Sequence, residues 1–256
     1  MAVASEAVSP EPRRRSLFTD SSATITLSFY QPSFRQTQHS HADPSVALLL
    51  SGAVDEEVGV KAAQAESGAI GIKAAGLRHG NVYGPQGAIL LTLTVHDPRL
   101  WRAAELDGGW AWAPAAAEVK RLVPAALGGR LCFGDLVPEL LALRIPDGAR
   151  PAAPLWLRSL RARLHDEPDL KAADLAAAAG VNRVHLSRSF ARCFGESLSA
   201  FRLRRKTELA VSAMLHDGMP PALAASEAGF ADQSHFARTV RRLLGHTPGQ
   251  LRSLTA

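Results

Sequence analysis

The sequence predicts a two-domain protein in which a β-rich N-terminal domain precedes an all-α C-terminal domain. Three observations support this fold class. Residues 23–98 contain several short segments in which apolar and polar residues alternate, which is typical of strands. Everything after residue 154 has helical periodicity, and a segment rich in proline and glycine, 146–154, separates the two parts. At 256 residues the chain is long enough for two separate cores.

Four segments of the first part have the composition of strands, and Gly, Pro, Asn and Asp separate them. Thr24–Tyr30 and Glu57–Lys61 alternate apolar and polar residues, as half-buried strands do. Val46–Gly52 and Ala88–Val95 are apolar runs that indicate buried strands, and Gly52 is expected to end the first of them in a turn. Because no helical pattern intervenes, we expect a small sandwich or barrel.

The region after residue 98 changes character. Helices are expected over Pro114–Val123 and Phe133–Leu143. Trp101, Trp110 and Trp112 lie near these helices and would suit a dimer interface, although packing in the domain's own core is the commoner use of such residues.

The chain is expected to be cytoplasmic and to make no contact with a membrane. Arg13–Arg15 could open a signal peptide, but the residues that follow are polar and include Asp20. No apolar run approaches the ~20 residues that a membrane span needs. Cys132 and Cys193 lie far apart without a CxxC partner, so neither a disulfide framework nor a thiolate zinc site is expected.

Two segments of the C-terminal part resemble one another, Asp174–Phe190 and Leu223–Val240. Each has a short Ala-rich helix, a glycine, an apolar residue, polar turn residues and a second amphipathic helix. Gly180 and Gly229 stand where the chain must turn sharply, which favours a residue that tolerates positive φ. The repeat therefore predicts two helix-turn-helix units.

The second helix of each unit has a capping residue and an outward-facing arginine. Asn182 and Asp232 are suited to cap these helices. Arg188 and Arg238 each stand between two core residues, so each projects to the face opposite the core. That is the face which a recognition helix presents to the DNA major groove.

These patterns together define the expected limits of each part. The limits are a disordered tail 1–22, a β-rich domain 23–98, a helical region for linkage or dimerisation 99–150, and an all-α domain 151–256 with helix-turn-helix units at about 172–194 and 221–244.

The positive charge belongs to the C-terminal part. Residues 1–150 carry 14 Lys and Arg against 15 Asp and Glu, whereas residues 151–256 carry 15 against 9, so the net charges are −1 and +6. A long amphipathic helix, Leu198–Leu215, is expected to join the two units. It has a basic face made of Arg202, Arg204, Arg205 and Lys206. This distribution favours a polyanionic partner.

At this point a family resemblance is visible. The last ~100 residues resemble the DNA-binding domain of AraC/XylS-type transcription regulators. The most specific stretch is Gly229–Phe236, and further matching residues are Arg238, Arg241, Arg242, Gly245, Thr247, Pro248 and Arg252. The first unit matches through Leu175, Ala176, Gly180, His185, Leu186, Arg188, Phe190 and Gly195. Val240 departs from the family, which usually has phenylalanine there, and Ala224 replaces a larger aliphatic residue. These departures indicate a lighter core in the second unit.

The resemblance implies roles for individual side chains. The residues expected to face bases are Val184, Ser187, Arg188, Gln233, Ser234, His235 and Arg238. Arginine can read guanine and glutamine can read adenine. The residues expected to contact phosphates are Arg183, Arg192, Arg204, Arg241 and Arg242. For His185 and His235, packing inside the domain is the alternative.

By its position before such a domain, segment 24–98 resembles the cupin-type sensor barrel of many family members. A His-x-His pair with a third, distant histidine can ligate a metal. The acidic ligand that metal-dependent cupins place after the second histidine is missing here, so we predict no metal and no cofactor. The loop His79–Gly87 is expected either to line an effector pocket or to hold the barrel edge. The pocket residues expected are His39, His41, His79 and Tyr83.

The resemblance implies a sequence-specific transcription regulator that binds double-stranded DNA. It implies an activator that responds to a small-molecule effector, and not an enzyme. RNA polymerase and a second copy of the chain are the further partners expected. A metal-dependent cupin enzyme with a helical appendage is the alternative, and it would need turnover that depends on the three histidines. A non-specific nucleoid-type binder is a third possibility, distinguished by uniform affinity for unrelated DNA.

Overall fold

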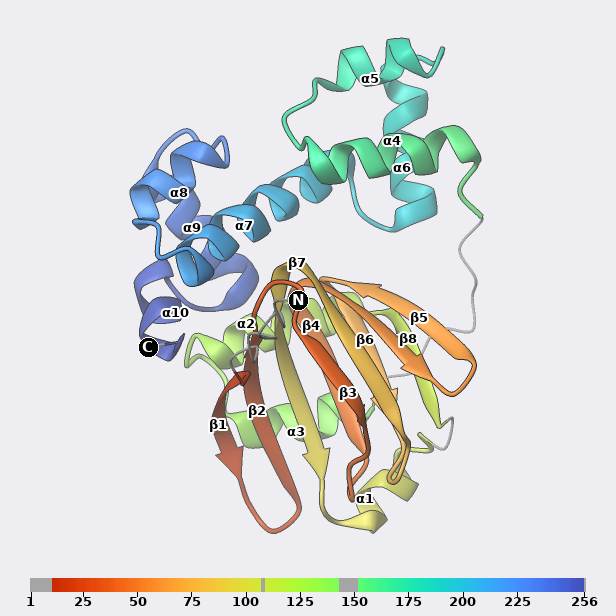
Figure 1. Cartoon of the computed structure of the whole chain (residues 1–256), viewed down its shortest axis with the longest axis vertical. Coiled ribbons are helices and arrows are strands. Elements are labelled where there is room, and N and C mark those ends of the chain that lie inside the picture. The colour runs from red at the N-terminus through yellow and green to blue at the C-terminus, as the bar shows by residue number, and fades with distance from the viewer. Residues whose placement is uncertain (1–10, 107–108, 143–151, 256) are drawn as a thin grey trace, which may run out of the picture.

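The computed structural model describes residues 11–106, 109–142 and 152–255. It confirms the predicted fold class, because an antiparallel sheet with short helices is followed by a helical C-terminal domain (Figure 1). The strands are β1 Arg13–Thr19, β2 Ala23–Tyr30, β3 Arg35–His39, β4 Ser45–Val58, β5 Lys61–Glu66, β6 Ala69–Lys73, β7 His79–Val95 and β8 Trp110–Pro114. The helices are α1 Pro98–Ala103, α2 Ala117–Leu127, α3 Phe133–Leu141, α4 Leu155–Asp166, α5 Ala172–Ala178, α6 Arg183–Phe194, α7 Leu198–His216, α8 Pro221–Glu227, α9 Gln233–Leu244 and α10 Pro248–Thr255.

The eight strands form one antiparallel sheet in the order β1-β2-β7-β4-β6-β8, with β3 paired to β7 and β5 paired to β4. The long strands β4 and β7 pair along most of their length, with irregular pairing between Leu49 and Ser51 and between Gly52 and Val54. One face of the sheet packs Ile25, Leu27 and Leu91 against α2 and α3. The other face has a smaller cluster around Tyr30 and Tyr83.

The sheet extends beyond the predicted domain limits at both ends. Arg13–Thr19 forms β1 and pairs with β2, so the expectation of a tail over 1–22 is wrong for this segment, while residues 1–10 lie outside the described residues. Trp110–Pro114 forms β8 on β6, so the region 99–150 is not wholly helical. β1 forms a hairpin with the neighbouring strand β2, whereas β8 pairs with β6, a distant segment that the sequence of β8 does not reveal.

Three local predictions in the sheet are corrected. Gly52 does not end a strand: it lies inside β4 with φ of 85°, and a Cβ there would lie 1.9 Å from the carbonyl oxygen of Gly87. Glu57–Lys61 is not one strand, because it spans the end of β4, a turn and the start of β5. The expected loop His79–Gly87 is the first half of β7, of which Gly80–Tyr83 pairs with β4.

The two helix-turn-helix units are built on different cores. The first unit has a cluster of its own, in which Leu164, Leu186 and Phe190 are completely buried. The second unit shares the large cluster of the N-terminal domain, which contains Val240 of α9 together with Val123 of α2. The light core predicted for the second unit is therefore completed by the sheet domain.

Figure 1 shows α7 running between the two units, with the sheet domain below it. At 19 residues, α7 is roughly 28 Å long. No helix in the described part of the chain is long and apolar enough to cross a membrane.

Candidate nucleic-acid interface

In the first helix-turn-helix unit, α6 buries one face and exposes the other. Gly180 has φ of 64° at the turn, as the sequence predicts. The Asn182 side chain accepts a hydrogen bond from the backbone N of His185 at 2.8 Å, which confirms the predicted N-cap. Leu186 and Phe190 are fully buried. The opposite face is exposed and carries Arg183, Val184, Ser187, Arg188 and Arg192.

The second unit repeats this arrangement in α9. Gly229 has φ of 74°, and the Asp232 side chain accepts a hydrogen bond from the backbone N of His235 at 2.6 Å. Phe236 and Val240 are fully buried. The exposed face carries Gln233, Ser234, Arg238, Arg241 and Arg242. Each unit therefore presents a capped, cationic helix face that can enter a major groove.

The two histidines of the recognition helices lie in different surroundings. The His185 ring is exposed and stacks on Trp156 at a centroid distance of 6.0 Å. The His235 ring is half-buried and meets Phe230 edge to face at 5.2 Å. Packing therefore accounts for the position of His235, and its expected contact with a base stays a prediction.

The basic face predicted for α7 is not a free surface. The Arg204 guanidinium binds Glu196 Oε1 at 2.7 Å and Glu208 Oε1 at 2.9 Å, and its side chain is 16% exposed. Burial alone would lower the pKa of Arg204, but Glu208 and Glu196 outweigh burial and raise it. In this arrangement Arg204 is a structural ion-pair partner, so its assignment as a phosphate contact is withdrawn.

The other three cations of α7 are also bound within the protein. Arg202 donates to the carbonyl oxygen of Pro168 at 2.6 Å, and Lys206 donates to that of Gly229 at 2.9 Å. Arg205 is buried, pairs with Glu208 and donates to the carbonyl oxygen of His165 at 3.1 Å. Sequence periodicity identifies these residues as polar, but their partners come from distant segments that it does not reveal.

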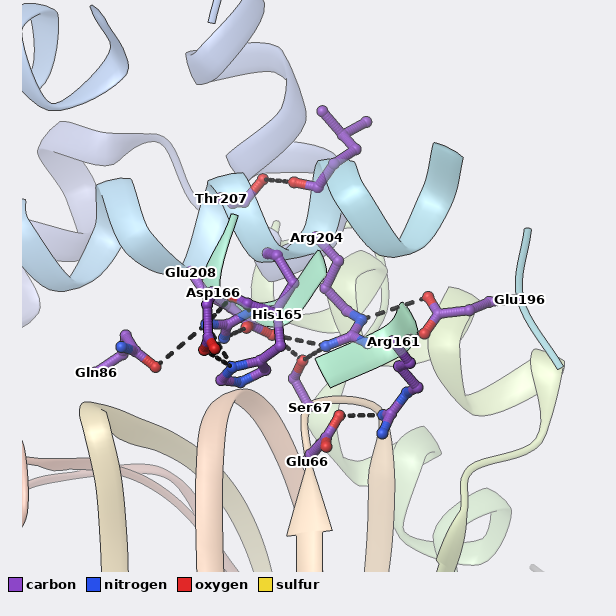
Figure 2. Close-up of polar contacts among 12 residues, drawn as sticks. Glu66, Ser67, Gln86, Arg161, His165, Asp166, Glu196, Arg204, Thr207 and Glu208 are labelled. Atoms are coloured by element: carbon purple, nitrogen blue, oxygen red, sulfur yellow. Dashed lines mark hydrogen bonds and ion pairs between the residues drawn. The ribbon is translucent and has the colours of Figure 1, made fainter. Parts of the chain in front are cut away.

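Glu208 is the centre of a polar network that joins α7 to the sheet domain (Figure 2). Ser67, in the turn between β5 and β6, donates to Glu208 and accepts from Arg204 at 2.8 Å. Burial alone would raise the pKa of Glu208, but Arg204 and Arg205 lower it. Beside this network, Arg161 of α4 pairs with Glu66 at the end of β5. No local sequence pattern indicates a role for Ser67, Glu66 or Glu208.

The sheet domain brings together the three predicted pocket histidines. The ring centroids of His39 and His79 are 4.3 Å apart, and that of His41 is 4.9 Å and 5.3 Å from them. One ligand atom of each lies within 4.8 Å of the others. Nδ1 of His39 lies 2.8 Å from the Thr37 carbonyl oxygen, and Nδ1 of His79 lies 3.1 Å from that of Leu77.

These backbone contacts determine what the cluster can do chemically. A carbonyl oxygen only accepts, so Nδ1 carries a proton in both rings, and in the neutral form of each ring Nε2 is the nitrogen with the lone pair. Nε2 of His39 and of His79 is buried without a hydrogen-bond partner. Burial, followed by the charge of Lys73, lowers the pKa of His79 to about 4, so this imidazole is neutral at neutral pH. Neutral imidazoles oriented by backbone carbonyls are the form in which histidine binds metals.

A carboxylate lies beside the histidines, although not at the position that the cupin pattern suggests. Glu56 Oε1 is 3.8 Å from His79 Nε2 and 2.7 Å from Lys73 Nζ. Its Oε2 accepts from the indole nitrogens of Trp110 at 2.7 Å and Trp112 at 2.5 Å. Burial alone would raise the pKa of Glu56, but Lys73 and the two indoles lower it. These two tryptophans therefore support a buried charge.

The structure does not place Tyr83 with the histidine cluster. The Tyr83 ring stacks on Tyr30 at a centroid distance of 3.8 Å, and its hydroxyl lies 3.4 Å from Gln36 Oε1. Tyr83 is 3% exposed, and burial, followed by Tyr30, raises the pKa of its phenol. Its expected contact with an effector stays a prediction.

Comparison with known proteins assigns a class to the C-terminal part. Residues 175–253 match a family model described as a helix-turn-helix domain. The chain is 30% identical over 139 residues to the transcriptional activator NphR of a Rhodococcus species, which is 50% of this chain and 41% of NphR. The chain thus spans about two fifths of the length of this curated relative.

Several solved structures overlap the chain with low similarity. ToxT from Vibrio cholerae covers 93% of this chain and 99% of its own, with 9% identity and a TM-score of 0.41. The C-terminal domain of AraT from Geobacillus stearothermophilus covers 40% of this chain and 86% of its own, with 23% identity and a TM-score of 0.37. An oxalate decarboxylase from Bacillus subtilis covers 33% of this chain and 25% of its own, with 14% identity and a TM-score of 0.31.

The fold, the two capped recognition helices and the family match define a helix-turn-helix domain of the DNA-binding class. The matched segment, residues 175–253, contains almost the whole of both units, and its closer resemblance to AraC/XylS-type regulators stays a prediction.

Proposed function

We propose that the chain is a sequence-specific transcription regulator that binds double-stranded DNA through α6 and α9. One observation carries this proposal: each helix has an exposed face with an arginine at the middle, opposite a fully buried core face. Arg188 and Arg238 would read bases, while Arg183, Arg192, Arg241 and Arg242 would bind phosphates. The likeness to an activator supports activation as the sign of regulation, with RNA polymerase as a partner.

A footprinting experiment tests this proposal on DNA that contains the segment upstream of the gene. The full chain should protect two short blocks on one face of the duplex. The double variant Arg188→Ala/Arg238→Ala should lose both blocks while it keeps binding at low salt, because phosphate contacts remain. Uniform protection by the wild-type chain would contradict the proposal and support a non-specific binder.

As a second candidate function, we propose that the histidine cluster binds a divalent first-row metal and makes the sheet domain a sensor. The two buried, unpartnered Nε2 atoms favour this over the unmetallated pocket that the sequence indicates. Attachment of the sheet domain to a DNA-binding domain favours a metal sensor over a metal-dependent enzyme. The enzyme stays the alternative.

Titration with Co²⁺, followed by visible absorption, tests the metal site directly. The wild-type chain should show bands typical of nitrogen ligation, and His39→Ala and His79→Ala should abolish them. His96→Ala is the matched control, because His96 pairs with Asp43 outside the cluster. A wild-type chain without saturable bands would contradict metal binding and leave the cluster as a pocket for an organic effector.

A further inference from the structure

A crevice rich in positive charge lies between α2 of the sheet domain and α9. It has a volume of about 420 Å³ and is open to solvent. Six of its seven lining residues are cationic, three from each domain. The lining residues are Lys120, Arg121, Pro124, Arg130, Arg238, Arg241 and Arg242.

Close packing fixes α2 against the C-terminal end of α9. Gly245, which ends α9 with φ of 72°, would place a Cβ 2.6 Å from both Cβ of Leu127 and the carbonyl oxygen of Pro124. Val123 of α2 and Leu244 of α9 belong to one buried cluster. The cations on the two helices therefore stay close to one another because their backbones are held by apolar contacts.

The arginines that line the crevice have few acidic neighbours among the described residues. None of its described lining residues is acidic. Glu118 lies 3.6 Å from Arg121, but both side chains are mostly exposed, so this pair contributes little. Like charges held side by side repel one another, and an anion that binds between them relieves the repulsion. The crevice therefore suits a partner with several negative charges.

The position of the crevice identifies the polyanion. Arg238, Arg241 and Arg242 line it, and they lie on the helix that the proposed function places in the major groove. A recognition helix inserts its N-terminal residues between the base edges, so its C-terminal half runs beside the phosphate backbone. The crevice is open along the surface, which suits a continuous strand of backbone.

We propose that α2 of the sheet domain and the turn after it are part of the DNA-binding surface, with Arg121 of α2 and Arg130 of the turn contacting phosphates beside those bound by α9. This inference rests on the proposed function. Each phosphate contact releases counterions, so one contact from α2 and one from the turn after it strengthen binding to every sequence and do not alter sequence preference. They also make DNA affinity depend directly on the position of the sheet domain.

The salt dependence of binding by the full chain tests this proposal. The double variant Arg121→Gln/Arg130→Gln is compared with Lys61→Gln/Arg78→Gln, which removes the same charge from exposed positions at turns of the sheet. The slope of log affinity against log salt concentration should become shallower by about 0.9 for each lost phosphate contact, only in the first variant. The ratio of affinities for specific and unrelated DNA should stay at the wild-type value.

Two results would overturn the inference while leaving the proposed function intact. One is equal slopes for both double variants, with sequence preference retained. The other is tight binding of tripolyphosphate by the wild-type chain, lost in Arg121→Gln/Arg130→Gln without any change in the DNA slope. Failure of the proposed function looks different, because the wild-type chain would then show no preference among DNA sequences.

Discussion

At the scale of single residues, arginines that resemble one another in sequence have different surroundings. Arg188 and Arg238 are exposed because buried residues lie two positions before and after them on short amphipathic helices. Arg204 and Arg205 lie on the longer helix α7, where Arg204 pairs with Glu196 and both arginines pair with Glu208. Helical periodicity correctly predicts that Arg188 and Arg238 are exposed. The burial of Arg204 and Arg205 depends on tertiary contacts that periodicity does not reveal.

Arg188→Ala and Arg238→Ala should each lower the affinity for the specific site by about 1–3 kcal/mol at one base position. Affinity for unrelated DNA should change little, because the phosphate contacts remain. Competition binding with single-base variants of the site measures both quantities. Arg78→Ala, on the sheet domain, is the control. Equal losses on every sequence would mean that these arginines bind phosphates and do not read bases.

At the scale of elements, the duplicated turn is what the sequence predicts best. The glycines, the caps and the alternation of core and exposed positions are all local signals, and the structure confirms them at Gly180, Asn182 and Asp232. The sheet is predicted less well. Gly52 and strand β8 depend on contacts with residues far along the chain, which no local pattern encodes. Strand β1 pairs with its neighbour β2, but most of its residues are exposed, so it has no apolar alternation that marks a strand.

The two turn glycines provide a matched pair of substitutions. Gly180→Ala should lower the free energy of unfolding by about 1–2 kcal/mol, because alanine is strained in the left-handed conformation. Its Cβ would point into open space, so no clash adds to this cost. Gly229→Ala should cost more, because its Cβ would lie 2.6 Å from Asp169 Oδ2 and 2.9 Å from Lys206 Nζ.

Denaturant unfolding of both variants measures this difference. The stronger effect at Gly229 follows from displacement of the Lys206–Asp169 ion pair, which lies against the turn. An effect at Gly229 no larger than that at Gly180 would show that this pair moves aside freely.

At the scale of the whole molecule, the sheet domain holds both units in different ways. The second unit shares the apolar cluster of the sheet domain, while the first has its own core and meets the sheet through polar contacts such as Arg161–Glu66. Glu208 lies between these regions on α7, where it binds Ser67, Arg204 and Arg205. Polar contacts of this kind can be released more readily than a shared core.

Glu208→Gln should lower the free energy of unfolding by about 3–5 kcal/mol at neutral pH, because Arg204 and Arg205 would lose a buried counter-charge. The pKa of Glu208 is lowered in the folded chain, so its contribution is present above its ordinary value of 4.5 and is lost as the pH falls through the folded-state pKa. The difference from wild type should therefore shrink in acid.

Denaturant unfolding at neutral pH and well below pH 4.5 checks both statements. Glu227→Gln, at an exposed position of α8, is the control and should have little effect at either pH. A loss for Glu208→Gln that matches the control at neutral pH would show that the network does not stabilise the fold.

Selection of bound fragments from random DNA by the full chain tests the central claim most directly. The account predicts enrichment of a bipartite motif, with two short conserved blocks whose centres are about 10–10.5 base pairs apart, one for each recognition helix. It also predicts that Arg188→Ala erases one block and Arg238→Ala erases the other. Fragments recovered without any common motif, at equal affinity, would contradict the account.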